Sequence, residues 1–249
     1  MPQRKVCLLT GAGRAGSIAH GIARGLAESG WDLGLVTLPA YDREVFGTPS
    51  GELSELVTEL RERGAEVHVV DADLSDVETP ARVVDEVAER LGALDALVLS
   101  HSHSIDSSIL DTTPEAFDRH FAVNARAAWL LIRAFANQVG PSGGAVVALT
   151  SDHVIHNLPY GASKGALDRI VVAAAGELGH LGIRANSVNP GPIDTGWMDD
   201  GIRASGLARQ PTGRLGTPAD IARLVRFLVS EDGSWVTGQL IKSDGGFSL

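Results

Sequence analysis

The sequence predicts an α/β fold in which a doubly wound parallel sheet of about seven strands carries helices on both faces. The first observation is that short apolar runs alternate along the chain with longer segments whose apolar residues recur at helical spacing. The second is that the short runs are apolar almost throughout, as strands are when helices cover both faces of a parallel sheet. This alternation favours a Rossmann-type sheet, and 249 residues suit a single domain, 1–249.

The individual elements follow from the same two patterns, taken in chain order. We expect strands at 6–9, 33–36, 67–70, 96–99, 145–149, 185–188 and 239–241. We expect helices near 18–29, 51–63, 78–91, 114–138, 160–181 and 218–230. Acidic residues or capping signals mark most helix starts, as in Thr113-Pro114-Glu115, because proline is tolerated in the first helical turn.

Two connections, 37–50 and 189–217, are long and rich in glycine, proline or aspartate. Long irregular loops in compact domains are usually functional, and ligands bind beyond the carboxyl ends of parallel strands. We therefore expect both loops to border the site and interpret 189–217 as a substrate loop. Within it, Trp197 and Met198 either contact substrate or form a small core of the loop itself.

Charge and composition exclude several classes of partner. The chain has 21 Lys and Arg against 31 Asp and Glu, so its formal net charge is -10, which repels nucleic acid and anionic lipid surfaces. No apolar run approaches the roughly 18 residues that a membrane span needs. The one cysteine, Cys7, lies in an apolar run and cannot form an internal disulfide, so we expect a cytoplasmic protein.

A glycine-rich turn follows the first expected strand. Gly11, Gly13 and Gly16 have the spacing of a dinucleotide fingerprint, and Ser17 and Ile18 then open the first helix. Glycines let the backbone turn tightly and approach a pyrophosphate, which the free N–H groups at the helix start would hold. An ordinary glycine-rich turn is the alternative, but the position between strand and helix favours dinucleotide binding.

The end of the second strand favours NADP over NAD. NAD-binding proteins usually place a carboxylate there to accept the adenosine ribose 2′-OH. Asp32 begins this strand, whereas Thr37 stands at its end, so no carboxylate repels a 2′-phosphate. Arg14 in the turn is able to pair with that phosphate, although it is also acceptable as a solvated loop residue. We expect NADP, with NAD still possible.

Tyr160 and Lys164 open the fifth expected helix four residues apart, so they share one face. A cation beside a phenol favours the phenolate and brings a weak acid into range for proton transfer. The chain has only two tyrosines, and Lys164 is one of three lysines. The pair is therefore a candidate acid–base site.

With this motif the sequence resembles the short-chain dehydrogenase/reductase family over nearly its whole length. Tyr160-Gly-Ala-Ser-Lys164 is similar to the family's Tyr-x-x-x-Lys, and Val236-Thr-Gly-Gln239 and Asp244-Gly-Gly246 match its C-terminal signature. The resemblance implies a catalytic tetrad of Asn124, Ser151, Tyr160 and Lys164. It implies cofactor-binding roles for Gly11, Arg14, Ser17, Ile18, Thr37, Asp73, Leu74, Ser100, Tyr160, Lys164, Pro190, Gly191, Ile193 and Thr195.

The chain also departs from the family pattern. Leu99-Ser100-His101-Ser102 stands where the family usually has Asn-Asn-Ala-Gly, and only eight residues separate Ser151 from Tyr160 instead of about a dozen. The first turn looks more like the enoyl-acyl-carrier-protein reductase branch. That branch places its tyrosine seven residues before the lysine, where this chain has Asn157, so enoyl reduction lacks its acid.

Four histidines, His101, His103, His153 and His156, follow the fourth and fifth strands. Imidazoles at such spacings can bind zinc, but no cysteine or well-spaced carboxylate completes a ligand set, so we expect no metal and consider a role in lining the substrate site.

The resemblance implies an NADP(H)-dependent oxidoreductase that interconverts a carbonyl and a secondary alcohol, similar to 3-oxoacyl-acyl-carrier-protein reductases. An enoyl-thioester reductase and a non-catalytic dinucleotide sensor are the alternatives. The partner is then a small-molecule substrate. Apolar residues on 114–138 and 160–181 exceed what one sheet face needs, and the family commonly pairs such helices in a homotetramer.

Overall fold

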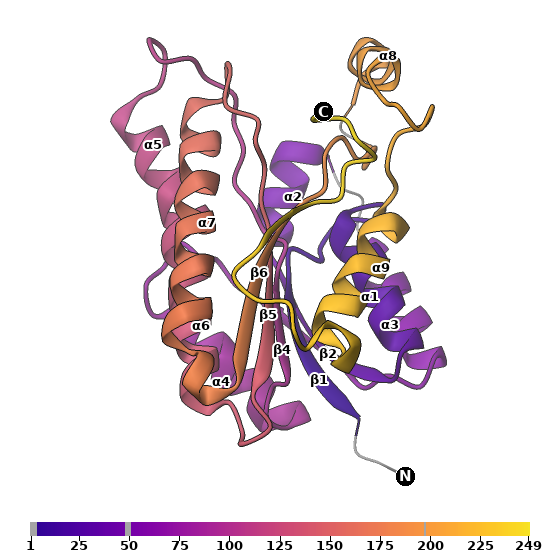
Figure 1. Ribbon diagram of the computed structural model, residues 1–249, viewed down its shortest axis with the longest axis vertical. Coiled ribbons are helices and arrows are strands. Elements are labelled where there is room, and N and C mark those ends of the chain that lie inside the picture. The colour runs from indigo at the N-terminus through magenta and orange to yellow at the C-terminus, as the bar shows by residue number, and fades with distance from the viewer. Residues whose placement is uncertain (1–3, 48–50, 197) are drawn as a thin grey trace.

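Seven parallel strands form one sheet at the centre of the computed structural model, which describes residues 4–47, 51–196 and 198–249 (Figure 1). The sheet order is β3-β2-β1-β4-β5-β6-β7. Strands β2 and β3 are added on one side of β1 and β4 to β7 on the other, which leaves a switch point between β1 and β4. The strands are β1 Lys5–Thr10, β2 Trp31–Thr37, β3 Val67–Asp71, β4 Ala96–Leu99, β5 Gly144–Leu149, β6 Ile183–Asn189 and β7 Leu240–Lys242. The predicted doubly wound sheet is confirmed.

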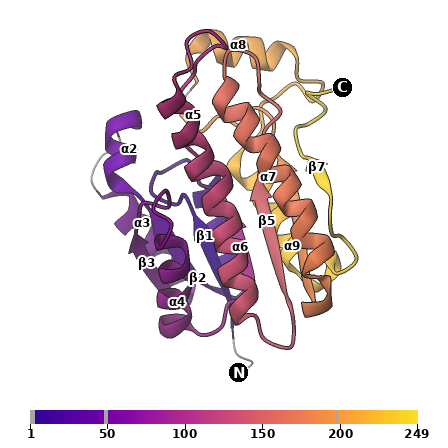
Figure 2. The same ribbon diagram turned by 90° about the vertical axis from the view of Figure 1, so that its left-hand side faces the viewer.

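Helices cover both faces of this sheet. On one face α1 packs against α9, and on the other α4 packs against α6, with α7 beside it (Figures 1 and 2). The bounds of the helices are α1 Ile18–Glu28, α2 Pro39–Phe46, α3 Glu52–Glu62, α4 Thr79–Leu91, α5 Pro114–Phe121, α6 Ala127–Gln138, α7 Leu158–Glu177, α8 Asp200–Ala208 and α9 Pro218–Val229.

Two apolar cores flank the sheet because successive side chains of a strand point to opposite faces. Cys7 and Leu9 of β1 join the core beneath α1 and α9, while Val6 and Leu8 join the core beneath α4, α6 and α7. Phe135 of α6 is completely buried in the second core. Both cores hold the carboxyl ends of the strands in fixed positions, and these ends position the site.

Three expected elements differ from the structure. The predicted loops 37–50 and 189–217 are wrong where α2 and α8 form, and residues 48–50 and Trp197 lie outside the described part of the chain. Neither helix buries a residue, so an apolar stripe was absent from the sequence. The expected helix 114–138 contains a π-helical turn, Ala122–Arg126, between α5 and α6.

Among the helices of the described ranges, none combines the length and the apolar character that crossing a membrane requires.

Candidate active site

Lys164 lies in the second turn of α7 with its side chain almost completely buried. Its Nζ donates a 2.8 Å hydrogen bond to the carbonyl oxygen of Leu149, at the end of β5, and lies 5.7 Å from the ring centroid of Tyr160. Burial lowers the pKa of Lys164 to about 8, and the charge of Asp168, one turn further along α7, opposes that shift. The ammonium group is therefore fixed in place but can lose its proton in a mildly alkaline solution.

The Tyr160 phenol has a raised pKa in this structure. Burial is the largest cause, and a hydrogen bond with the Ser151 hydroxyl acts in the opposite direction. This direction is opposite to the one expected from the Tyr160–Lys164 spacing, because burial outweighs the influences that favour the phenolate. A protonated phenol is the form that can donate a proton to a substrate oxygen. Ser151 lies beside Tyr160 despite the shortened loop between them.

Asn124 lies in the π-helical turn between α5 and α6, and it is 1% exposed. Its Oδ1 accepts from the backbone N–H of His103 at 2.7 Å, and its Nδ2 donates to the His103 carbonyl and the Ser163 hydroxyl, both at 2.9 Å. Ser163 in turn donates to the backbone carbonyl of Tyr160 at 2.7 Å. Asn124 thus ties the loop after β4 to the first turn of α7, and a π-turn often marks such a functional position.

His101 occupies one of the positions at which the chain departs from the family pattern. Its Nδ1 lies 2.6 Å from the Thr10 hydroxyl, and its Nε2 lies 3.1 Å from the carbonyl of Val123. Burial and then the charge of Lys164 lower the pKa of His101 to about 4, so the ring is neutral near pH 7. Nε2–H then donates to Val123, and Nδ1 accepts from Thr10. The ring connects the end of β1 to the turn that carries Asn124.

Tyr41 of α2 reaches the same end of the sheet, which the sequence did not indicate. Its ring centroid lies 5.6 Å from that of His103, and His103 packs against His120 at 4.5 Å. Burial lowers the pKa of His103 to about 4. Tyr41 was missed because 37–50 was expected to be a loop.

The four histidines that follow β4 and β5 do not form one group. His101 and His103 are turned into the protein, whereas His153 and His156 are exposed. Within the described ranges, no three His, Cys, Asp or Glu side chains are arranged to hold a metal ion.

The phosphate-binding turn has the expected backbone. Gly11 and Gly16 have φ of 78° and 71°, which favour glycine, and Ser17 caps α1 by accepting from the N–H of His20. A Cβ on Gly11 would lie 2.8 Å from the backbone nitrogen of His101, so a larger residue is excluded. The Glu52 carboxylate accepts the N–H of Ala15 at 2.6 Å. An anionic group of the chain itself therefore already binds this turn.

Arg14 does not point freely into solvent. Its guanidinium donates to the carbonyl and the hydroxyl of Thr195 in the expected substrate loop and lies 4.3 Å from the ring centroid of Phe46. Burial lowers the pKa of Arg14, while the charges of Asp42 and Glu52 raise it. Arg14 is thus placed at the junction of the turn, α2 and the loop after β6.

Asp42 was missed by the sequence reasoning. The Oδ2 of Asp42 would overlap with a Cβ placed on Gly13. That Cβ would lie 3.7 Å from Cβ of Thr37. Thr37 is 3% exposed, and its hydroxyl has no hydrogen-bond partner in the described chain. The end of β2 therefore lacks a carboxylate of its own, as expected, but α2 brings one close to it.

The remaining expected cofactor residues lie along the ends of β3, β4 and β6. The Asp73 carboxylate accepts a hydrogen bond from the backbone N–H of Ser75 and pairs with Arg119 at 3.1 Å. Burial raises the pKa of Asp73, but these contacts outweigh burial and keep the pKa below its usual range. The side chain of Leu74 is buried in the core, so it is not available for contact with a ligand. The N–H of Ser100 donates to the Thr10 hydroxyl.

The segment after β6 begins with Pro190 and Gly191. Gly191 has φ of 63°, and a Cβ there would meet Asp244. Ile193 is 4% exposed and forms an isolated bridge with Gly216, while Thr195 accepts from Arg14. The segment is therefore anchored to the C-terminal region at one end and to the phosphate-binding turn at the other.

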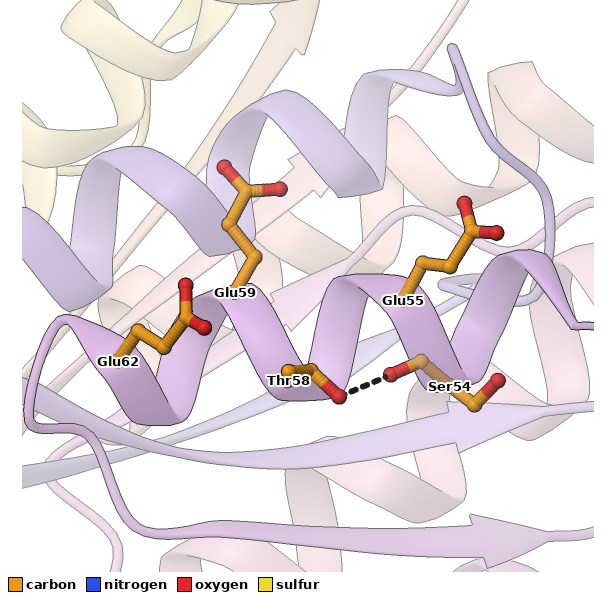
Figure 3. A pocket seen from close by; sticks show the side chains of 5 residues that line it. All are labelled: Ser54, Glu55, Thr58, Glu59 and Glu62. Carbon is orange, nitrogen blue, oxygen red and sulfur yellow. Dashed lines mark hydrogen bonds between the residues drawn. The ribbon is translucent and has the colours of Figure 1, made fainter.

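A hollow on the surface of α3 lies apart from these residues. It is lined by Ser54, Glu55, Thr58, Glu59 and Glu62 (Figure 3). Three carboxylates repel phosphate groups, and Glu59 already pairs with Arg24 and Arg63. We therefore exclude this hollow as the dinucleotide site.

Comparisons with known proteins identify the family of the chain. Residues 11–248 match the family model described as enoyl-(acyl carrier protein) reductase. The short-chain dehydrogenase/reductase eriH of Hericium erinaceus is 34% identical, and the match covers 99% of this chain and 98% of the relative. Two solved structures, each 30% identical, cover 98% of this chain. One is a blue fluorescent protein from a metagenomic library in complex with NADPH, with a TM-score of 0.87 and 98% of that chain covered. The other is the angucycline C-6 ketoreductase LanV with bound NADP, with a TM-score of 0.86 and 95% of that chain covered.

Both the family model and this relative match nearly the whole chain. The chain belongs to the short-chain dehydrogenase/reductase family and is an oxidoreductase of the NAD(P)-dependent kind.

Proposed function

We propose that the protein uses NADP(H) to interconvert a ketone and a secondary alcohol. The arrangement that carries this proposal is the buried Lys164 and Tyr160 on one face of α7, with Ser151 at the phenol and Asn124 bonded to Ser163 one turn away. When bound, the nicotinamide supplies or accepts the hydride, and the protein supplies position and proton handling.

Each side chain has a separate task in this proposal. The Tyr160 phenol, whose pKa burial raises, is protonated and donates its proton to the oxygen that becomes an alkoxide during reduction. Ser151 hydrogen-bonds the same oxygen and orients it. Lys164 places a positive charge close to the phenol, which stabilises the phenolate left after proton transfer. Asn124 holds the loop after β4 against α7, so these groups keep their positions.

The phosphate-binding turn fits a dinucleotide. Glu52 shows that the N–H of Ala15 can bind an anion, and the unpartnered Thr37 hydroxyl provides a polar group at the end of β2. Arg14 would hold a 2′-phosphate, and two similar solved structures carry NADPH or NADP. The Asp42 carboxylate beside Gly13 would repel a 2′-phosphate and so limits this preference. We therefore propose NADP(H) as the preferred cofactor, with NAD(H) accepted more weakly.

Assays distinguish this proposal from its two alternatives, enoyl reduction and non-catalytic dinucleotide sensing. A 3-oxoacyl thioester is one ketone that the proposed chemistry would reduce. Enoyl reduction would need an acid at Asn157, which is a buried amide and cannot donate a proton as a phenol does. The non-catalytic sensor would have no use for the ordered Tyr160, Lys164, Ser151 and Asn124 group.

We also propose a homotetramer of a single-domain chain that works in the cytoplasm. Phe117, Trp129 and Val172 leave large apolar side chains exposed on α5, α6 and α7. Other apolar residues of these helices, such as Phe135 and Val171, are buried within the chain. Light scattering at micromolar concentration tests this point, and a monomer mass would reject it.

The deciding experiment compares wild type with Tyr160→Phe. We expect NADPH oxidation with a ketone and none with a 2-enoyl thioester, and we expect the variant to lose at least about 100-fold in turnover. Binding of NADPH, followed by fluorescence, should stay within a few-fold because only the hydroxyl is lost. Turnover of the enoyl substrate alone, or a variant that keeps more than a few per cent of the activity, would contradict the proposal.

A further inference from the structure

Five large aliphatic side chains stand exposed on two loops at the carboxyl end of the sheet. Ile105, Ile109 and Leu110 lie between β4 and α5, and Val154 and Ile155 lie between β5 and α7. Leu110 is 91% exposed and Ile155 is 70% exposed. We call these five residues the aliphatic rim. Clustered exposed aliphatic side chains are unfavourable in water and usually mark a surface that binds another molecule.

The two loops of the rim contact each other and the catalytic residues. The N–H of Leu158, the first residue of α7, donates to the carbonyl of Ser107 at 3.1 Å. A Cβ on Gly161, the residue after Tyr160, would lie 2.7 Å from Cγ1 of Val154. The backbone of His153 also donates to Ser151 at 3.2 Å. The rim is therefore continuous with the surface at which Tyr160 and Ser151 meet a substrate.

The same loops are acidic. Segments 100–113 and 151–157 contain Asp106, Asp111 and Asp152 and no Lys or Arg, so three negative charges and no positive ones give a formal charge of -3 with histidines neutral. Of the three arginines in the expected substrate loop, Arg209 stacks on the Phe247 ring at 4.1 Å, and the other two are paired with carboxylates. Arg203 pairs with Asp194 and Asp200, and Arg214 pairs with Asp220.

This combination discriminates between kinds of carbonyl substrate. A 3-oxoacyl group delivered on coenzyme A or on an acidic carrier protein brings several negative charges to the surface next to Tyr160. These charges meet Asp106 and Asp111, and neither loop has a Lys or Arg to offset them, whereas Asp152 pairs with Lys242 at 3.4 Å. The two remaining aspartates oppose the approach of an anionic carrier electrostatically. An uncharged apolar ketone meets no such repulsion and buries the aliphatic rim.

We propose that the substrate is a neutral, largely apolar ketone, such as a fused-ring or long-chain ketone without an anionic carrier. The inference rests on the proposed carbonyl reduction at Tyr160 and names the class of molecule that this site takes. This substrate class distinguishes the protein from a 3-oxoacyl reductase whose substrate is bound to a carrier protein.

A matched pair of thioesters isolates the effect of the carrier. S-acetoacetyl-N-acetylcysteamine and acetoacetyl-coenzyme A have the same ketone and differ in the charged handle, and 1-decalone serves as the neutral apolar ketone. At saturating NADPH and low salt, we expect kcat/KM for 1-decalone and for the uncharged thioester to exceed that for the coenzyme A thioester by about tenfold or more. Added salt should narrow the gap between the thioesters by screening the aspartates.

The outcomes of this assay separate the two proposals. Equal or faster reduction of acetoacetyl-coenzyme A, with activity lost in Tyr160→Phe, overturns the substrate class and leaves carbonyl reduction standing. No turnover of any ketone overturns both proposals.

Substitutions in the rim provide the second test. Leu110→Asp and Ile155→Asp should each raise KM for 1-decalone about fivefold to tenfold, with kcat and NADPH affinity little changed. Val77→Asp replaces an exposed aliphatic residue before α4 and should leave KM unchanged. Light scattering on the same variants checks the alternative use of the rim. A fall in assembly mass with unchanged KM would make it a contact between copies of the chain and overturn the proposal.

Discussion

The proposed catalytic residues and the glycine-rich turn from Gly11 to Gly16 lie at the same end of the sheet but are held by different kinds of contact. Lys164 and Asn124 are almost completely buried, and their side chains bond mainly to backbone groups of neighbouring segments. Around the turn, Arg14, Asp42 and Glu52 are only partly covered and interact through charges. The catalytic groups are thus fixed before any ligand arrives.

This difference shows how the two regions respond to a ligand. A buried amide has few alternative partners, so removing it leaves other polar groups unsatisfied. A partly exposed carboxylate such as Glu52 can exchange its partner for water at little cost. The turn therefore holds a carboxylate that a phosphate can displace, whereas the catalytic groups need no rearrangement.

Replacing Asn124 should have the largest effect on stability. Asn124→Ala leaves the N–H and carbonyl of His103 without their partner, which should lower the free energy of unfolding by about 2 to 5 kcal/mol and reduce kcat. Asn157→Ala is the matched control, since Asn157 is equally buried but its Oδ1 has no partner in the described chain. We expect that control to cost less than about 1 kcal/mol. Urea unfolding compares the two variants, and equal losses would refute the special role of Asn124.

The rate of carbonyl reduction should depend on the protonation of Lys164. Its pKa is lowered to about 8, so the ammonium loses its proton as pH rises through that value. We expect kcat to be level below about pH 8 and to fall about tenfold per pH unit above it, because the phenolate then forms without a neighbouring cation. In Lys164→Arg the charge persists, so this fall should vanish even if the rate is lower. If kcat of Lys164→Arg fell at the same pH, the fall would have to arise from a group other than Lys164.

The buried histidines should not add a step to the pH dependence of kcat. His101 and His103 have pKa values lowered to about 4, so neither contributes a step between about pH 5 and pH 8. A step in kcat near pH 6.5 that disappears in His101→Gln would show that the ring is not held neutral as described.

Removing Arg14 should weaken NADPH selectively. Arg14→Ala loses one charge-assisted contact, worth about 1.5 to 3 kcal/mol or a roughly tenfold to hundredfold change in NADPH affinity, and should leave NADH nearly unchanged. Arg43→Ala, an exposed arginine on α2, is the control. Steady-state kinetics with both cofactors decides the matter. Equal losses would mean that Arg14 acts on the shared pyrophosphate or, through Thr195, on the loop after β6.

The carboxylates near the turn should have the smallest effects. Asp42→Asn removes a negative charge beside Gly13 and should shift preference toward NADPH by about threefold to tenfold. Glu52→Gln should improve the affinity for both cofactors by a similar small factor, because the N–H of Ala15 belongs to the turn that faces the shared pyrophosphate. Glu55→Gln on the same helix is the control. Tighter NADPH binding in Glu52→Gln without tighter NADH binding would contradict this division of roles.

Much of this molecule was predictable because the relevant signals are local. The apolar strands alternate with helices within short windows, and Tyr160 and Lys164 share a face because residues four apart do so on any helix. The turn from Gly11 to Gly16 lies between its strand and helix, as its spacing indicates. The predicted bounds of β4 are the observed ones, and most other elements differ by only one to three residues.

The elements that were missed lack a local signal. Neither α2 nor α8 buries a residue, so no apolar periodicity distinguished either from a loop. The π-helical turn at Asn124 is also invisible in a sequence window, since its neighbours continue the apolar pattern of a helix.

The sequence by itself determined the order of the strands and of the helices that pack on the sheet, and it indicated the candidate acid–base pair, because these signals depend on residues close together in the chain. Only the tertiary structure decided that Tyr41 lies by His103, that His101 bridges Thr10 and Val123, and that burial raises the pKa of Tyr160. These features depend on segments that are far apart in sequence and meet only when the sheet and its two cores have formed.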